Sequence, residues 1–446
     1  MAHDCLIHNA LVLTLEAGTA PLCGGYVAVQ DGKIARVGPD PGPEALPSAR
    51  EYLDAEGGMV LPGLVNTHTH AAMVWFRGLA DDLPLKTWLT DFIFPAETGW
   101  LNEEKVYWGT LLAAAELIRG GVTTVADGYF FAAAARRAFH EAGLRAVAAQ
   151  GVVDFPAPGV PDPRDNLRVA AEFLDSGAGF SPRLTSAVFC HSPYTCRAET
   201  LQAAKDLTRR RGVPFFLHLS ETREEVADVQ KNTGLFPTAY LDGLGVLDEL
   251  TVAVHGVWLT AEEQEILARR GVKVSHCPES NLKLASGVAP VPELLSRGVT
   301  VGLGTDGAGS NNNLDLWGEM SLAARLHKVW QGDPTVLPAA RVVALATREG
   351  AKVVGLEGRV GTLTPGAEAD LIVLAASPPH LTPMFDPFSH LVYAARAGDV
   401  EHVMAGGRWL MRRRQLTTLN WPEIAGRVRA QSLKLASFCQ KLRPRP

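Results

Sequence analysis

Short apolar runs alternate with longer amphipathic stretches through the middle of this chain. Eight of the runs have the length and composition of buried strands: Met59–Asn66, Val122–Asp127, Arg145–Gly151, Leu184–Cys190, Pro214–His218, Thr251–His255, Val272–His276 and Thr300–Thr305. Helix-like segments, such as Glu103–Arg119 and Ala261–Arg269, lie between them. This alternation is typical of βα units around a parallel sheet, and eight such strands in about 250 residues predict an α/β fold of the closed (β/α)8 TIM-type barrel class.

Two β-rich pieces flank this middle region. Strand-like runs broken by Gly, Pro and Asp turns stand at Ala10–Leu15, Tyr26–Gln30, Ala369–Ala375, Val400–Ala405 and Arg408–Met411. The shared pattern predicts one small β-sandwich domain built from both chain ends. We therefore expect residues 1–58 and 366–446 to form this domain, with a terminal helix over Trp421–Pro446, and residues 59–365 to form the barrel.

The composition is that of an ordinary globular enzyme, and it disfavours several kinds of partner. The 446 residues are 47% hydrophobic and 20% charged, with a formal net charge of −6, whereas a nucleic-acid binder would carry a basic face. No apolar run reaches the roughly 18 residues that a membrane span needs, and the N-terminus lacks the pattern of a signal peptide. The six cysteines include no CxxC pair, which fits a reducing compartment. We expect a cytoplasmic protein that binds neither nucleic acid nor a membrane.

Polar side chains recur where the predicted strands end. These positions are His68 and His70 on the first strand, His191 after the fourth, His218 on the fifth, His255 on the sixth and Asp306 after the eighth. In a barrel of this kind the βα loops converge at the C-terminal ends of the strands. The sequence therefore predicts that these side chains meet at one mouth of the barrel.

Four of these side chains could hold a divalent metal ion. His68 and His70 are two residues apart on a strand and therefore point to the same face. His218 and Asp306 would complete a His3Asp shell with one position left for water. Taken singly, His218 could be a core histidine and Asp306 a turn residue, but their conjunction favours the metal site. No lysine lies near the end of the fourth strand to bridge a second ion, so we expect one ion.

Glu221 has two interpretations. It follows His218 by three residues, so it can share the cavity only if the chain has already left the strand. The run S-E-T-R-E-E favours this, because it opens the next helix. The alternative is a carboxylate of the first helical turn, stabilised by about 0.5 kcal/mol by the helix dipole. Beside a metal site, a carboxyl group could protonate a ring nitrogen of a substrate.

Longer stretches around these residues resemble one enzyme family. They are PGLVNTHTHAAMVWFRGLADDLPLKTWLTDFIFPAE, HSPY, HLSE, HGVWLT, SHCPESNLKLASG, GTDGAGSNNNLDLWGEM and PGAEADLIVL. They are similar to the amidohydrolase superfamily and, within it, to the 5-methylthioadenosine/S-adenosylhomocysteine deaminases, relatives of the triazine chlorohydrolases. The resemblance covers nearly the whole chain.

The resemblance implies further roles. It implies that the His3Asp shell binds one divalent ion per subunit, with Zn²⁺ as the expected metal. It also implies that Glu97 holds the ribose hydroxyls, that His191 contacts the purine ring, that Trp88 lines the pocket and that Ser310 lies near the substrate. From the residues alone, Glu97 is a loop carboxylate and Trp88 a core side chain.

One position departs from the family pattern. Members that accept S-adenosylhomocysteine tend to carry an arginine for the amino-acid carboxylate where this chain has Gln150. Arg164 could match a second such arginine, although its Pro-rich loop aligns loosely. Losing a charge-assisted contact costs roughly 1.5–3 kcal/mol. This favours 5′-methylthioadenosine or adenosine over S-adenosylhomocysteine as the substrate.

The expected reaction is metal-dependent hydrolytic deamination of an adenosine-type nucleoside to the inosine analogue and ammonia. Glu221 would protonate the ring nitrogen, and Asp306 and His255 would flank the attacking water. A second hypothesis is an amidohydrolase acting on another amino- or chloro-substituted heterocycle, such as guanine or a triazine, which Glu97 argues against. A third is an inactive barrel that serves as a scaffold. The resemblance also implies a homo-oligomer, a dimer or a tetramer.

Overall fold

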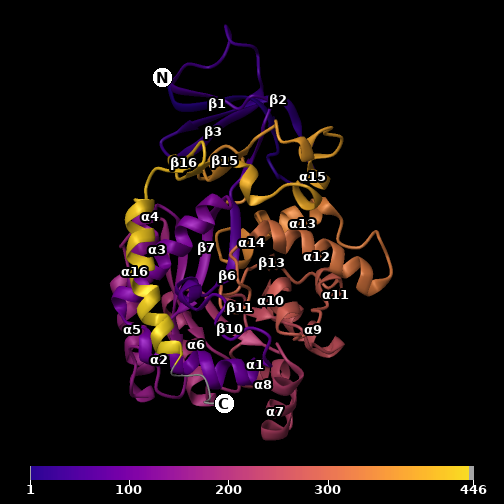
Figure 1. The fold of residues 1–446 in the computed structure, drawn as a ribbon. Coiled ribbons are helices and arrows are strands. Elements are labelled where there is room, and N and C mark those ends of the chain that lie inside the picture. The colour runs from indigo at the N-terminus through magenta and orange to yellow at the C-terminus, as the bar shows by residue number, and fades with distance from the viewer. Residues whose placement is uncertain (1, 441–446) are drawn as a thin grey trace.

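The computed structural model describes residues 2–440, which form a barrel and a smaller sheet (Figure 1). The small sheet lies above the barrel in this view, next to the end where the first barrel strand begins. No helix within the described range is long and apolar enough to cross a membrane.

Eight parallel strands follow one another around the barrel in chain order. They are β6 (Leu64–Thr69), β7 (Val122–Tyr129), β8 (Arg145–Val152), β9 (Leu184–Cys190), β10 (Phe215–Leu219), β11 (Thr251–His255), β12 (Lys273–His276) and β13 (Val301–Leu303). The ring closes where the backbone N–H groups of Thr305 and Asp306 both donate to the carbonyl oxygen of His68, at 3.1 Å each. A Cβ at Gly304 would lie 2.9 Å from the backbone nitrogen of His68, so this close approach requires glycine.

Helices cover the outside of the barrel, and several begin at residues that suit a helix N-terminus. The side chain of Asn102 accepts a hydrogen bond from the N–H of Lys105 before the first long helix, and Thr260 and Glu263 form a capping box further along. The helices are α3 (Glu103–Arg119), α4 (Ala132–Ala142), α5 (Asn166–Gly177), α6 (Ala198–Arg211), α7 (Arg223–Thr233), α8 (Pro237–Gly243), α9 (Ala261–Arg270), α10 (Pro278–Lys283), α11 (Val291–Ser296), α12 (Leu316–Gln331), α13 (Ala339–Leu345) and α14 (Arg348–Val353).

Both chain ends build the second sheet, as expected. Within residues 2–440 it has nine strands in one mixed sheet: β1 (His3–Val12), β2 (Leu22–Gln30), β3 (Lys33–Pro39), β4 (Ala49–Asp54), β5 (Met59–Pro62), β14 (Leu371–Leu374), β15 (Val400–Ala405), β16 (Arg408–Arg412) and β17 (Gln415–Leu416). The two ends join where β5 pairs with β14 in antiparallel register. The predicted barrel with a small β domain from both ends of the chain is confirmed.

The expected first barrel strand, Met59–Asn66, is in fact two strands. Met59–Pro62 belongs to the small sheet and Leu64–Thr69 to the barrel. Gly63 separates them, and a Cβ there would lie 2.1 Å from Oγ1 of Thr123 on β7. Because only glycine fits so close to β7, the chain can pass from one sheet directly into the other at this residue.

The terminal helix, α16 (Trp421–Cys439), lies alongside α3 and α2 (Phe94–Trp100), where it appears in yellow in Figure 1. Ile424 and Leu435 are buried on its inner face. Helix α16 is therefore docked on the barrel, and the part of the predicted helix beyond residue 440 lies outside the described residues.

Candidate active site

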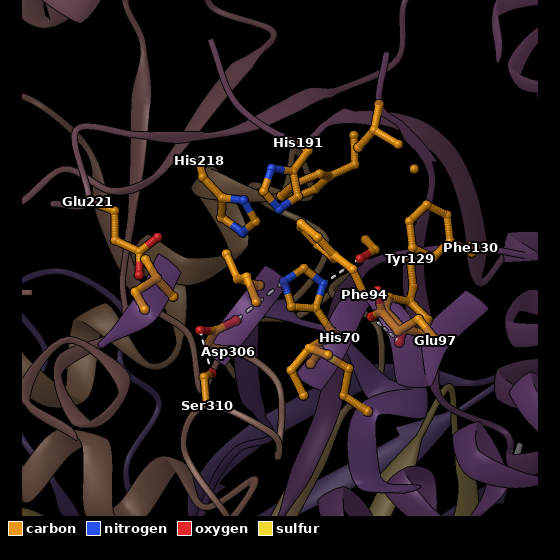
Figure 2. A pocket seen from close by; sticks show the side chains of 18 of the residues that line it. His70, Phe94, Glu97, Tyr129, Phe130, His191, His218, Glu221, Asp306 and Ser310 are labelled. Atoms are coloured by element: carbon orange, nitrogen blue, oxygen red, sulfur yellow. Dashed lines mark hydrogen bonds and ion pairs between the residues drawn. The ribbon is translucent and has the colours of Figure 1, made fainter. Parts of the chain in front are cut away.

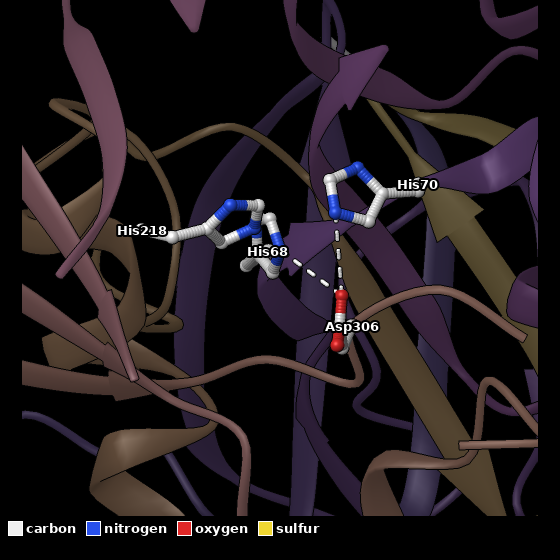
Figure 3. Close-up of side chains that lie close together, drawn as sticks. All are labelled: His68, His70, His218 and Asp306. Carbon is white, nitrogen blue, oxygen red and sulfur yellow. Dashed lines mark hydrogen bonds and ion pairs between the residues drawn. The ribbon is translucent and has the colours of Figure 1, made fainter. Parts of the chain in front are cut away.

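Four side chains from three parts of the barrel meet at its C-terminal mouth. His68 and His70 come from the end of β6, His218 from β10 and Asp306 from the residues after β13. One potential ligand atom of each lies within 4.8 Å of the others. Oδ1 of Asp306 is 3.2 Å from Nε2 of His68 and 3.4 Å from Nε2 of His70 (Figure 3). The structure therefore brings together the His3Asp set predicted from the sequence.

The electrostatics of this cluster suit a divalent metal ion. Burial lowers the pKa of His68 to about 4 and holds the pKa of His218 well below its ordinary value, so these imidazoles are neutral at pH 7. Burial alone would raise the pKa of Asp306, but its hydrogen bond with His68 and the surrounding imidazoles keep it well below the usual range. Neutral imidazole nitrogens and one carboxylate are the donors that zinc and similar ions prefer. The residues present fit such an ion.

Neighbouring polar groups orient these side chains. Nδ1 of His70 donates to the carbonyl oxygen of Gly128 at 2.5 Å, which turns its Nε2 toward Asp306. Oδ2 of Asp306 accepts hydrogen bonds from Ser280 and Ser310, each at 2.7 Å. Such outer partners fix the orientation of metal ligands and tune their basicity.

Three non-glycine residues at the strand ends have a left-handed backbone. The φ angles are +50° at Ser220, +72° at His255 and +58° at Asp306. Side chains other than glycine rarely adopt this conformation, and such residues cluster at functional sites. At Ser220 the chain turns out of β10, so Glu221 lines the same cavity as His218. Helix α7 begins only at Arg223, so Glu221 is not a carboxylate of its first turn.

Glu221 and His255 are neighbours in the lining of the cavity. Nδ1 of His255 donates to Oδ1 of Asn281 at 2.9 Å, which leaves its Nε2 3.7 Å from Oε2 of Glu221. Glu225 accepts hydrogen bonds from the backbone N–H groups of Ser220 and Glu221, at 2.8 and 2.7 Å. Burial raises the pKa of Glu221. A carboxyl group whose pKa is raised can hold a proton near neutral pH and donate it.

A concave cavity opens above this cluster, and most of the side chains that line it are apolar or aromatic, as in small-molecule sites. At one end stand His218, Glu221, Asp306 and Ser310, and at the other Phe94, Glu97, Tyr129 and Phe130, as Figure 2 shows. The short segments after β6 cover it: η1 (Ala71–Phe76), α1 (Leu85–Thr87), η2 (Trp88–Ile93) and α2.

Glu97 is the polar group of the aromatic end. Its side chain is only 4% exposed, and Oε1 accepts a hydrogen bond from the hydroxyl of Tyr129 at 2.5 Å. Burial raises the pKa of Glu97 to about 7. His191 lies between the two ends in Figure 2, and burial lowers its pKa to about 3, so its ring is neutral at pH 7.

The structure brings most of the predicted substrate residues into this cavity but not all of them. Trp88, Glu97, His191 and Ser310 line it. Arg164 does not; its side chain is 86% exposed on η3 (Pro163–Asp165), and its Nε lies 2.9 Å from Oδ2 of Asp162. Gln150 is buried outside the lining, where its Oε1 accepts the N–H of Ala132 at 3.2 Å.

Comparison with known proteins identifies the family of this chain. Residues 59–410 match the model of the amidohydrolase family. The chain belongs to the amidohydrolase family. A relative of this amidohydrolase in Syntrophobacter fumaroxidans, named 5-methylthioadenosine/S-adenosylhomocysteine deaminase, is 48% identical over 96% of this chain and 97% of its own length.

Two further relatives match this amidohydrolase over most of both chains. A protein of Methanothermobacter thermautotrophicus named 5′-deoxyadenosine deaminase is 45% identical over 89% of this chain and 91% of its own length. The crystal structure of an adenosine deaminase from Xanthomonas campestris with bound zinc superimposes with a TM-score of 0.95 at 35% identity, covering 98% of this chain and 99% of that one.

Sequence reasoning missed the side chains that support the site. Asp127 accepts the N–H of Ala71 at 2.6 Å, directly after His70. It stands at the end of a predicted strand, as His218 does, so the same sequence signal could have located it. Ser280 and Asn281 carry no such signal, because each acts through a partner 26 residues away that only the fold of this amidohydrolase brings near. Glu225 acts within its own segment, on the N–H groups of Ser220 and Glu221.

Proposed function

We propose that the protein catalyses the hydrolytic deamination of an adenosine-type nucleoside to the inosine analogue and ammonia. The observation that carries the proposal is a buried carboxyl group, Glu221, which shares one cavity with a His3Asp cluster and with a second buried carboxyl group, Glu97. The names of the relatives agree with it. The cytoplasmic location and the homo-oligomer expected from the sequence stay predictions.

The metal in this proposal is one zinc ion per chain. His68, His70, His218 and Asp306 would hold it. A zinc ion at such a site lowers the pKa of a coordinated water toward about 7 and so supplies a nucleophile at neutral pH.

The side chains divide the proton transfers among themselves. Burial raises the pKa of Glu221 and so favours its protonated form, and in this proposal Glu221 donates a proton to the purine nitrogen beside the carbon that carries the amino group. That carbon becomes electrophilic, and the water oxygen bonds to it while Asp306 and His255 orient the water and take up its proton. The proton then moves to the amino group, the carbon–nitrogen bond breaks, and ammonia leaves, while the proton of the new hydroxyl group returns to Glu221 and leaves the carbonyl group of the inosine analogue.

The remaining polar groups hold the nucleoside. Glu97 has a carboxylate oxygen to accept hydrogen bonds from the ribose hydroxyls, and His191 and Trp88 would contact the purine. Ser310 donates to Asp306 and keeps its carboxylate in position. A free base such as guanine, or a triazine, has no ribose for Glu97 to bind, so the buried Glu97 favours a nucleoside over those substrates.

The test is ammonia release by the purified protein from 5′-methylthioadenosine, adenosine, guanine and melamine, together with its metal content. We expect ammonia from the nucleosides alone and about one zinc ion per chain. Glu221→Gln should retain the metal and lose about 10²–10⁴-fold in kcat, while the exposed Glu224→Gln should match the wild type. Ammonia from guanine or melamine but from no nucleoside would contradict the proposal. A chain without metal and without activity would support the scaffold hypothesis.

A further inference from the structure

We propose that the cavity selects nucleosides whose 5′ substituent is apolar and uncharged, and that it discriminates against a tail that carries a carboxylate. This inference rests on the proposed function. The base must reach Glu221 and Asp306, and the ribose must reach Glu97. The 5′ carbon then lies toward the side chains around Glu97, which are Phe94, Tyr129 and Phe130 (Figure 2).

The surface at this end of the cavity is aromatic and aliphatic. The ring of Phe94 packs against Phe155 with centroids 5.3 Å apart, and Phe130 packs against Tyr129 at the same distance. Val153 completes the wall and is fully buried. The hydroxyl of Tyr129 already donates to Glu97. A methylthio group or a short alkyl chain would therefore find dispersion contacts here and displace no hydrogen bond.

The charges of the cavity oppose an anionic tail. Among the described residues that line it, none is Lys or Arg, whereas Glu97, Glu221 and Asp306 are carboxyl groups. A carboxylate brought into this space would lose its hydration and meet no lysine or arginine among the lining side chains. Burying an unpaired charge of this kind costs several kcal/mol.

Two arginines in the loops that follow β8 and β9, Arg164 and Arg197, are bound elsewhere. Arg164 is exposed and paired with Asp162. The Nε of Arg197 lies 3.4 Å from Asp154. The amide of Gln150 is hydrogen-bonded to the backbone at Ala132 and Gly151, and it brings no charge. None of these side chains lines the cavity.

Cations outside the mouth of the cavity could bind the carboxylate of a long tail, and the experiment must test this alternative. Beyond Leu89 and Tyr194 a wider outer space carries Lys86, Arg223 and Lys283. A long tail could pass the aromatic wall and place its carboxylate among these cations. Tail length and tail charge therefore have to be varied independently.

The experiment compares kcat/KM of the wild-type enzyme for adenosine, 5′-methylthioadenosine, 5′-butylthio-5′-deoxyadenosine and S-adenosylhomocysteine. We expect the two neutral thioethers to agree within about tenfold, and S-adenosylhomocysteine to be about 100-fold poorer than the butylthio compound, mainly through KM. Calorimetric Kd values for the products, 5′-methylthioinosine and S-inosylhomocysteine, should differ in the same direction.

Each outcome has one meaning. S-adenosylhomocysteine within tenfold of 5′-methylthioadenosine would overturn the inference and leave the deaminase proposal standing. Equal losses for the butylthio compound and S-adenosylhomocysteine would show selection by length and would also overturn it. No ammonia from any of the four nucleosides would overturn the proposed function itself.

A pair of variants tests the aromatic wall directly. Phe130→Ala should lower kcat/KM for 5′-methylthioadenosine about tenfold and lower it less for adenosine, because the removed ring contacts the 5′ substituent. The control is Phe385→Ala, since Phe385 is 89% exposed and does not line the cavity. Equal losses for both nucleosides in Phe130→Ala would contradict the assignment of this wall.

Discussion

Three carboxyl groups line one cavity, and their surroundings shift their pKa values in different directions. Glu97 and Glu221 are buried with no lysine or arginine in the cavity lining, and burial raises the pKa of each, that of Glu97 to about 7. Asp306 is equally buried, yet its hydrogen bond with His68 and the nearby imidazoles hold its pKa well below the usual range. Similar side chains can therefore serve as proton donor and as metal ligand within a few ångströms, because only the neighbours differ.

At pH values above the ordinary pKa of a glutamate, the buried Glu97 should lower the free energy of unfolding. Its folded-state pKa of about 7 exceeds the ordinary value of 4.5, so the folded state binds the proton more tightly, and stability falls as the pH rises from 4.5 to 7. Glu97→Gln removes this cost. The variant should gain nothing at pH 4.5 and up to about 3 kcal/mol at pH 8, measured as Tm against pH. The exposed Glu104→Gln is the control, and a gain that does not depend on pH would contradict the assignment.

At the scale of elements, the turn between β10 and α7 decides what Glu221 can do. The left-handed backbone of Ser220 turns the chain out of the strand, and Thr222 caps α7 by accepting the N–H of Glu225. Glu225 then holds the N–H groups of Ser220 and Glu221. One short segment therefore ends a strand, starts a helix and holds the backbone of Glu221 beside the cavity.

We expect Glu225→Ala to lower kcat about 10–100-fold, as for other residues that position a catalytic group. The metal content should stay unchanged, because no metal ligand contacts Glu225. Glu225→Gln keeps one acceptor oxygen and should recover part of the rate. Glu224→Ala removes the neighbouring exposed carboxylate and serves as the matched control. A loss of metal together with activity, or equal losses in both alanine variants, would refute a positioning role.

At the scale of the whole molecule, a buried ion pair joins the barrel to the small sheet. Arg145 begins β8 and Asp370 directly precedes β14, and both side chains are 1% exposed. The guanidinium donates to both oxygens of Asp370, at 3.0 and 3.2 Å, and Gly406 of the small sheet donates to the same carboxylate at 2.7 Å. This contact lies at the N-terminal end of the barrel strands, where residues serve stability and not catalysis.

Replacing Arg145 with Met should leave a buried carboxylate without its cation. Breaking a buried pair from one side costs about 3–5 kcal/mol, so Arg145→Met should unfold at a clearly lower temperature than Arg137→Met, in which an exposed arginine is lost. Below its Tm the Arg145 variant should keep the wild-type kcat and metal content. An unchanged Tm, or a loss of kcat in the folded variant, would contradict a purely structural role.

The sequence alone was sufficient to predict the barrel and the four side chains that meet at its mouth. Strand and helix periods are local properties, and a polar residue at a strand end is visible without knowing the fold; this is how His68, His70, His218 and Asp306 were found. Glu97 came only from the resemblance to a family, because it lies on α2 within a long βα connection and carries no periodic signal of its own.

Only the tertiary structure decided the contacts between distant residues. The local sequence pattern cannot show that Oδ1 of Asp306 lies beside His68, 238 residues away, or that Asn281 orients His255. Nor can it state that Gly63 divides one apolar run between two sheets, or that Arg164 pairs with Asp162 on the surface. These outcomes depend on which side chains meet after packing, and packing is a property of the whole chain and not of any window along it.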